Sequence, residues 1–274
     1  MAFPRHDLLT AVERSPRLVA EHDRAGWVAL YTPDAVIEDP VGSRPHRGLA
    51  EIDRFYATFI APRDITFHVR RDVVVDETVV RDVDLEVGMT AGVTMRIPAV
   101  LRYDLAGVDG ELKITRLQAF WELPGMVATF LRRGPRAVPA GGALTVGLLR
   151  NQGLGGAAGF LAGLRGAGPS GRRHVARFLE DARAGDEVAV RRRLGRGARI
   201  SVGENRPLSG AELLRALGDV RCDKLIAAGR HVVAAIDSPT GEHGVVIADV
   251  ENRPFAITRV RLFPSLGLTR SDRG

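Results

Sequence analysis

The sequence predicts an α+β protein made of two similar domains, each with helices packed on a curved antiparallel sheet. Apolar residues recur with a helical period between residues 7 and 60, and the period changes to two between Ile65 and Trp121. The same succession returns in weaker form after Arg172. A repeat at this long period indicates duplicated domains rather than a solenoid.

The helical part of the first domain divides into three segments. Residues 7–31 predict two helices, broken near Ser15-Pro16 or near His22-Asp23. The short apolar run 34–37 predicts a helix-to-turn segment, and residues 49–60 predict a third helix with apolar residues at helical spacing.

The rest of the first domain predicts strands. Alternating apolar residues indicate four of them, within residues 65–69, 79–89, 93–105 and 112–121. The sequence Gly-Val-Asp-Gly at 107–110 is a hairpin signal between the last two. A curved sheet wrapped over helices leaves a cavity at its open end, which is a usual place for a ligand.

The hexapeptide Glu38–Ser43 organises this domain. Pro40 disfavours a helical backbone at Asp39, so this carboxylate is expected on a turn, where it could shuttle a proton or cap the next helix. The order helix, Glu-Asp-Pro-Val-Gly-Ser, then Gly-x-x-x-Ile-x-x-Phe-Tyr resembles the bacterial ketosteroid isomerases. These belong to a wider cone-shaped family with nuclear transport factor 2 and the SnoaL-like polyketide cyclases. The resemblance covers roughly residues 9–125.

The resemblance implies roles for particular residues. The aspartate of the hexapeptide moves a proton between two carbons in the isomerases, so Asp39 is the candidate acid/base. This chemistry needs a carboxylate in a largely apolar cleft, where its pKa rises into the useful range. The expected substrate-binding residues are Tyr56, Val100, Arg102, Leu117, Ala119 and Trp121. Ordinary core packing is the alternative explanation for Tyr56 and Trp121.

Two positions depart from the family pattern. The isomerases polarise the substrate carbonyl with a tyrosine on the first helix and a protonated aspartic acid on a late strand. Ungapped alignment puts Ser15 and Val100 there, and neither supplies the same donor. Loss of such a donor costs about two to three orders of magnitude in rate. Arg102 could polarise a carbonyl instead, or pair with the acidic stripe at residues 82–86.

The resemblance and the repeat together predict the domain organisation. A cone domain with the candidate pocket is expected at 5–130, a Gly/Ala/Pro-rich linker with short helices at 131–171, and a second, degenerate cone at 172–267. In the second copy Val202 stands in the place of Asp39, and the sheet is expected to be shorter by about one hairpin. Fusing two copies would let their sheets pair within one chain as a pseudo-dimer; independent domains and further oligomers remain open.

Composition limits the partners and the compartment. The chain has a net charge of +6, but its arginines are scattered without interleaved aromatic residues, so no nucleic-acid partner is expected. Cys222 is the only cysteine, which excludes an internal disulfide and predicts a reducing compartment. No Cys/His group has metal-ligand spacing, so no metal is expected. Without a signal-peptide core or a membrane-spanning apolar run, the expected location is cytoplasmic, away from the membrane.

The leading hypothesis is a ketosteroid isomerase-like protein that binds a small apolar molecule containing a carbonyl group. It would catalyse proton transfer of the isomerase, lyase or cyclase type with Asp39 as acid/base and no cofactor. The alternative is a non-catalytic module that binds a hydrophobic ligand or a protein partner. A hydrogen-bond donor facing Asp39 across the pocket would favour catalysis, whereas an apolar wall would favour binding.

Overall fold

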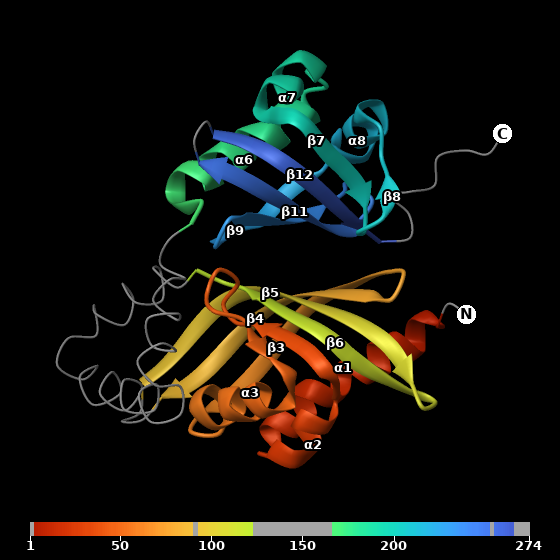
Figure 1. Cartoon of the computed structure of the whole chain (residues 1–274). Coiled ribbons are helices and arrows are strands. Elements are labelled where there is room, and N and C mark those ends of the chain that lie inside the picture. The colour runs from red at the N-terminus through yellow and green to blue at the C-terminus, as the bar shows by residue number, and fades with distance from the viewer. Residues whose placement is uncertain (1–2, 90–92, 123–165, 253–254, 266–274) are drawn as a thin grey trace. The chain divides into compact units, whose positions relative to one another are not determined.

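Two six-stranded sheets, each with helices on one face, form the described part of the computed structural model (Figure 1). The structure describes residues 3–89, 93–122, 166–252 and 255–265. The chain divides into two compact units, and the second contains the chain from Gly166 onward. The predicted α+β class with two cone domains is therefore confirmed.

The helices of the first unit lie at its N-terminal end. They are α1 (Arg5–Ala20), α2 (Arg24–Ala29) and α3 (Gly48–Phe55), which continues as the π-helical turn η1 (Tyr56–Ile60). Pro16 lies inside α1, so the helix break is at His22-Asp23. There the Asp23 carboxylate accepts a hydrogen bond from Gly26 N at 2.8 Å, which caps α2.

The segment after α2 is a strand, β1 (Tyr31–Glu38), so the predicted helix-to-turn segment is wrong. Ala35 and Ile37 are fully buried on one face, and the strand pairs in parallel with β6 (Glu111–Phe120). Such a short apolar run fits a helix or a strand equally well, and here the partner strand decides the outcome.

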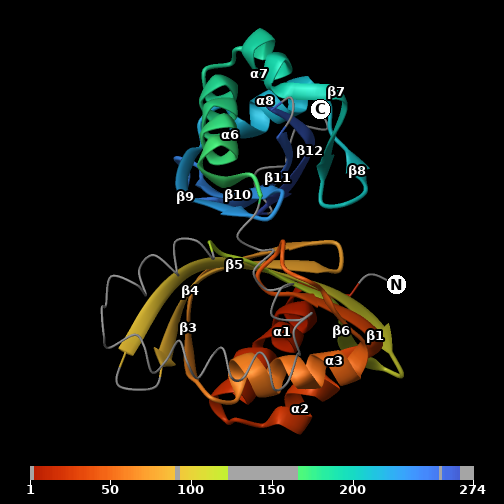
Figure 2. The ribbon, with the colours of Figure 1, turned by 60° about the vertical axis from the view of Figure 1, so that its left-hand side comes forward.

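The first sheet has the strand order β2-β1-β6-β5-β4-β3 and curves around α1 and α3 (Figure 2). Its β1–β6 pair is parallel, whereas β4–β5 and β5–β6 are antiparallel, so the sheet is mixed. The remaining strands are β2 (His46–Arg47), β3 (Asp64–Val75), β4 (Thr78–Met89) and β5 (Val93–Val108). We call the face that packs on the helices the inner face, and the other the outer face.

The second unit repeats this design. Its sheet order, β8-β7-β12-β11-β10-β9, matches the first strand for strand, including one parallel pair between β7 and β12. The expected loss of a hairpin is therefore wrong. The elements are α6 (Gly168–Arg183), α7 (Glu187–Arg193), β7 (Leu194–Val202), β8 (Arg206–Pro207), α8 (Gly210–Leu217), β9 (Arg221–Ala228), β10 (His231–Asp237), β11 (His243–Asn252) and β12 (Phe255–Pro264).

The core of the second unit is almost entirely aliphatic. Phe178 and Leu179 of α6, with Leu213 and Leu217 of α8, pack on the inward side chains of β10, β11 and β12. Ser209 and Glu212 form a capping box at the start of α8.

Most of the predicted linker, up to residue 165, lies outside the described residues. Helix α6 begins at Gly168, so the last part of the predicted linker is helical. The limits 5–130 and 172–267 stay predictions. Within the described ranges, no helix combines the length and the hydropathy needed to cross a membrane.

The pairing of the two sheets as a pseudo-dimer also stays a prediction. If it is right, the protein in solution should scatter X-rays as one compact particle of the mass of a single chain. A scattering profile of two well-separated lobes would contradict it. A concentration series distinguishes this pairing from dimerisation between chains, since only the latter depends on dilution.

A candidate active site in the first unit

Asp39 lies directly after β1, on the inner face of the first sheet. Ile37, two residues earlier on the same face, is fully buried and pairs with Leu117 of β6. The turn is fixed to β6 by the hydrogen bond from Val41 N to Ala119 O, at 2.9 Å. Trp121, just past β6, donates its indole N–H to Asp39 Oδ1 at 2.6 Å. Two hydrogen bonds at the end of β6, one to the turn and one to the carboxylate, therefore hold Asp39 in one position.

The surroundings of Asp39 change its ionisation. Its side chain keeps partial exposure, but the protein around it is dense enough that burial raises the pKa of Asp39 to about 6, from an ordinary value of 3.8. The hydrogen bond from Trp121 opposes this by stabilising the carboxylate and lowers the pKa. A carboxylate with a pKa near neutrality suits general acid/base catalysis.

Leu117 and Ala119 share the inner face with Trp121 and Asp39, so the structure brings these four predicted residues together. Across the β5–β6 ladder, Ala119 lies opposite Leu101 and Leu117 lies opposite Tyr103. Residues directly opposite each other in an antiparallel pair point to the same face. Leu101 and Tyr103 of β5 therefore share the inner face with Leu117 and Ala119.

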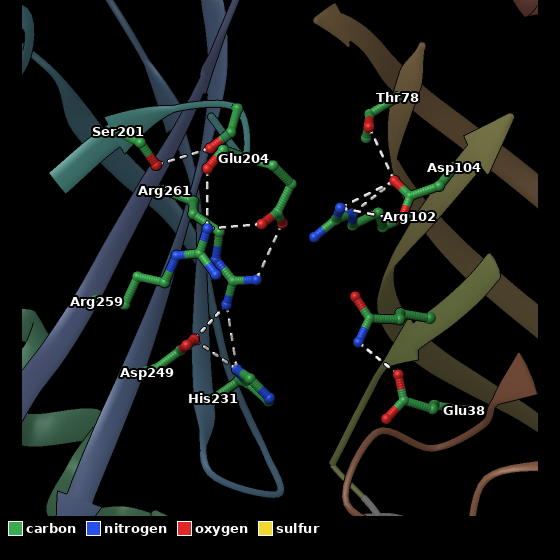
Figure 3. Close-up of polar contacts among 12 residues, drawn as sticks. Glu38, Thr78, Arg102, Asp104, Ser201, Glu204, His231, Asp249, Arg259 and Arg261 are labelled. Atoms are coloured by element: carbon green, nitrogen blue, oxygen red, sulfur yellow. Dashed lines mark hydrogen bonds and ion pairs between the residues drawn. The ribbon is translucent and has the colours of Figure 1, made fainter. Parts of the chain in front are cut away.

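The predicted placement of Val100 and Arg102 in the pocket is wrong. They pair with Phe120 and Gln118 on the outer face, one residue out of phase with the inner positions. Figure 3 shows Arg102 beside Asp104, and their nitrogen–oxygen distances are 3.0 Å. On the same face, Gln118 donates a hydrogen bond to Glu38 at 2.6 Å. Arg102 thus pairs with an acid, Asp104 of its own strand.

Tyr56 is buried, and its ring packs beside Trp27 with centroids 5.4 Å apart. Burial raises the pKa of Tyr56, and its charged neighbours are Asp23, which also raises it, and Arg24, which lowers it. The Tyr56 hydroxyl is buried and has no hydrogen-bond partner among the described residues. Trp27 is the centre of an aromatic cluster that it forms with Tyr31, Phe55 and Tyr56.

Tyr103 is a polar residue of the inner face that was not among the predicted site residues. It is 1% exposed and lies on the inner face opposite Leu117. Burial raises the pKa of Tyr103 to about 12, Arg81 and a hydrogen bond with Ser15 lower it, and Asp72 and Asp39 raise it. A signal was present in the sequence, because apolar residues 101, 103 and 105 alternate with the charged residues 102 and 104.

Ser15 and Arg81 complete the polar interior of the first unit. Ser15 of α1 is buried and accepts a hydrogen bond from Trp27 Nε1 at 3.0 Å. Arg81 lies on the inner face of β4, opposite Leu101, with its side chain 2% exposed. Its guanidinium binds Asp72 at 2.8 Å and Glu13 of α1 at 2.8 Å. Burial lowers the pKa of Arg81, but these partners raise it further, so the group stays charged.

The second unit has a different chemistry at the equivalent place. Its β7–β12 register places Val202 where the first unit has Asp39, and Val202 is buried. The charged residues of β12 point away from the helices. Arg259 and Arg261 alternate with the core residues Val260 and Leu262, and their guanidinium groups bind Glu204 (Figure 3). Arg261 also binds Asp249 and His231 there.

The site holds no group suited to a metal within the described residues: no three His, Cys, Asp or Glu side chains converge in a way that could bind an ion. The polar interior of the first unit consists instead of one carboxylate, hydroxyl groups, an indole N–H and a guanidinium ion. These groups can move a proton and hold an oxygen atom.

Comparisons with known proteins show which family the first half of the chain is similar to. The family model of the SnoaL-like domain matches residues 12–117. A curated relative, the steroid Δ-isomerase of Nocardioides simplex, is 30% identical over 123 residues, which are 45% of this chain and 96% of that protein. The match therefore covers nearly the whole of the relative but only the first half of this chain.

Similar solved structures cover a similar share of this chain. Rv0760c from Mycobacterium tuberculosis, solved in complex with estradiol-17β-hemisuccinate, is 28% identical, with a TM-score of 0.39, over 43% of this chain and 95% of that one. A Δ5-3-ketosteroid isomerase from Mycobacterium sp. is 27% identical, with a TM-score of 0.40, over 43% and 95% of the two chains.

Proposed function

The chain belongs, through its first half, to the SnoaL-like family of ketosteroid isomerase relatives, and on this basis we propose that the first unit binds a small apolar carbonyl compound and moves a proton beside its carbonyl group. Asp39 is the acid/base in this proposal. The observation that carries it is the pairing of a carboxylate whose pKa is about 6 with an apolar wall and a phenol on the same face.

The geometry around Asp39 supports a base rather than a structural acceptor. Trp121 occupies Oδ1, which fixes the plane of the carboxylate and leaves Oδ2 as the oxygen that can take a proton. A helix cap would need a backbone N–H donor close to the carboxylate. Asp39 instead bonds to a side chain 82 residues away. The capping explanation therefore lacks support.

The proposed reaction needs no group outside the chain. Asp39 Oδ2 accepts a proton from the carbon next to the carbonyl group, and the carbon–hydrogen electron pair becomes the double bond of an enolate. The carbonyl π electrons move to the oxygen. The same carboxyl group then returns the proton to the original carbon or to another carbon of the conjugated system, which regenerates Asp39.

Non-catalytic binding is the second candidate function. It is favoured by Ser15, which stands where the resembling isomerases place a tyrosine donor. The relatives that match include both a steroid isomerase and a protein solved with a bound steroid derivative, so both functions fit the family.

Hydrogen exchange in D₂O tests the proposal without knowledge of the natural substrate. A panel of apolar ketones and enones, including a 5-ene-3-ketosteroid, is incubated with the protein, and deuterium at the carbons beside the carbonyl is followed by NMR. We expect protein-dependent exchange for the compounds that bind. Binding without exchange across the panel would support the non-catalytic module and reject the proposal.

The exchange rate should also depend on pH in a defined direction. Since burial raises the pKa of Asp39 to about 6, the free protein holds the basic carboxylate above that pH and loses it below. We expect kcat/KM to be level above about pH 7 and to fall about tenfold per pH unit below about pH 6. A profile that stays level down to pH 4 would contradict the role of Asp39.

A further inference from the structure

The inner face of the first sheet carries a polar group that the proposed function does not use. We infer that the Tyr103 hydroxyl donates a hydrogen bond to the substrate carbonyl oxygen, with Ser15 positioning the hydroxyl and Arg81 placing positive charge behind it. This inference rests on the proposed function and narrows its substrates to enolisable carbonyl compounds, whose oxygen becomes negative during the reaction.

The sheet register places Tyr103 at a suitable distance from Asp39. Strand β6 lies between β1, which carries Asp39 at its end, and β5, which carries Tyr103. Two strand spacings amount to about 10 Å between backbones. The side chains of β6 between them are Leu117 and Ala119, which are small or apolar. A carbonyl group and its neighbouring carbon can therefore lie over β6, with one polar group on each side.

The hydrogen-bond network leaves the Tyr103 proton available. The Trp27 indole can only donate, so Ser15 Oγ is the acceptor in their 3.0 Å bond. A side-chain hydrogen bond also joins Ser15 and Tyr103 and lowers the pKa of Tyr103. Because Ser15 Oγ accepts from Trp27, the Ser15 proton can go to the Tyr103 oxygen, and in our inference the phenol proton is then the one given to the substrate oxygen. With a pKa of about 12, Tyr103 keeps that proton at neutral pH.

Arg81 supplies a fixed positive charge on the same face. It lies on β4 diagonally across from Tyr103, since Arg81 pairs with Leu101 and Val79 pairs with Tyr103. Its Nη1 is buried and has no hydrogen-bond partner among the described residues, while Nε and Nη2 bind Asp72 and Glu13. Fixed donors and charge near a developing oxyanion stabilise the transition state more than the ground state.

In this inference the substrate carbonyl oxygen gains negative charge and loses it again during the reaction. As Asp39 removes the proton from carbon, the carbonyl π electrons move to the oxygen, and the Tyr103 hydrogen bond strengthens without transfer of its proton. When Asp39 returns the proton to carbon, the electrons return and the bond weakens. Tyr103 touches the substrate and is therefore a catalytic residue, whereas Ser15 and Arg81 act through it.

The test uses 4-nitrophenolate, a stable anion that resembles an enolate and whose visible absorption reports binding. The full chain carries Asp39→Asn, because a neutral side chain there matches the protonated carboxyl group present beside the enolate. We expect this variant to bind the phenolate, and addition of Tyr103→Phe to weaken binding by about 10- to 100-fold, as expected for a hydrogen bond to a charged group. Ser15→Ala should weaken it less, and in the same direction.

Thr78→Val in the same background is the matched control. It also removes a hydroxyl from this sheet, but Thr78 pairs with Asp104 on the outer face and bonds to it at 2.8 Å. Its phenolate affinity should equal that of Asp39→Asn alone. Circular dichroism and thermal midpoints establish that each variant is folded before titration.

Each outcome bears either on the inference about Tyr103 or on the proposed function of the first unit. Undetectable phenolate binding by Asp39→Asn, or affinity unchanged by Tyr103→Phe, would overturn the inference about Tyr103. Carbonyl exchange that is lost in Asp39→Asn but unchanged in Tyr103→Phe would overturn the inference and leave the proposed function standing. Absence of exchange by the unmodified protein would reject the proposed function itself.

Discussion

Replacement of Asp39 by asparagine is expected to lower the rate of carbonyl hydrogen exchange by about two to four orders of magnitude. The asparagine amide oxygen can still accept the indole hydrogen bond of Trp121, so the turn and the shape of the pocket are kept. The amide cannot accept a proton from carbon. The loss should therefore fall on kcat, with KM nearly unchanged.

Glu38→Gln provides the matched control for this experiment. Glu38 precedes Asp39 in the same hexapeptide but lies on the outer face, where it accepts a hydrogen bond from Gln118. Its replacement by the neutral amide should leave the exchange rate within a few-fold of the unmodified protein. Full activity of Asp39→Asn would remove Asp39 from the mechanism, and equal losses in both variants would indicate damage to the turn rather than loss of a base.

The sequence contained enough information to find Asp39 and its neighbours on β6. Leu117, Ala119 and Trp121 follow one strand with period two, and such alternation fixes which residues share a face once one of them is placed. The fold class followed from the same change of period. These predictions depend only on order along one segment, which a sequence displays directly.

The residues on β5 could not be placed in this way, because their register depends on another strand. The β5–β6 ladder pairs Val100 with Phe120 and Arg102 with Gln118, on the outer face. An ungapped alignment contains no information about this pairing, and it put both residues in the pocket. The alternation within β5 alone would have turned Tyr103 inward, but only the ladder shows that it faces Leu117.

The polar interior of the first unit depends on partners that are distant in sequence. Arg81 interrupts an apolar strand, and nothing in its neighbourhood shows that Glu13, 68 residues earlier, neutralises it. The second unit supplies the contrast. It repeats the strand order with an aliphatic core and Val202 at the position of Asp39. The same fold is thus compatible with an interior that contains polar groups and with an almost entirely aliphatic one.

The same Asp39→Asn change is expected to stabilise the first unit at neutral pH by about 3 kcal/mol. Burial raises the pKa of Asp39 to about 6 in the folded protein, from an ordinary value of 3.8 that applies when the chain is unfolded. Between these pH values the folded state binds more protons than the unfolded state, so stability falls as pH rises. Above about pH 6 the full cost of the buried charge remains, at about 1.4 kcal/mol for each unit of the shift.

Fluorescence can follow this effect in the first unit alone, because the chain has two tryptophans and both, Trp27 and Trp121, lie there. Urea unfolding at pH 7.5 should give a higher midpoint for Asp39→Asn than for the unmodified protein. The difference should shrink as the pH falls below 6 and vanish only below pH 3.8, where the carboxyl group is protonated in both the folded and the unfolded state. Asp34→Asn, which removes an exposed carboxylate from the same strand, should change the free energy of unfolding by less than about 0.5 kcal/mol.

A gain in stability that accompanies a loss of turnover is the behaviour of a carboxylate kept charged for chemistry. If Asp39→Asn instead destabilises the first unit at pH 7.5, the carboxylate serves the fold as an acceptor for Trp121, and its raised pKa has no catalytic meaning.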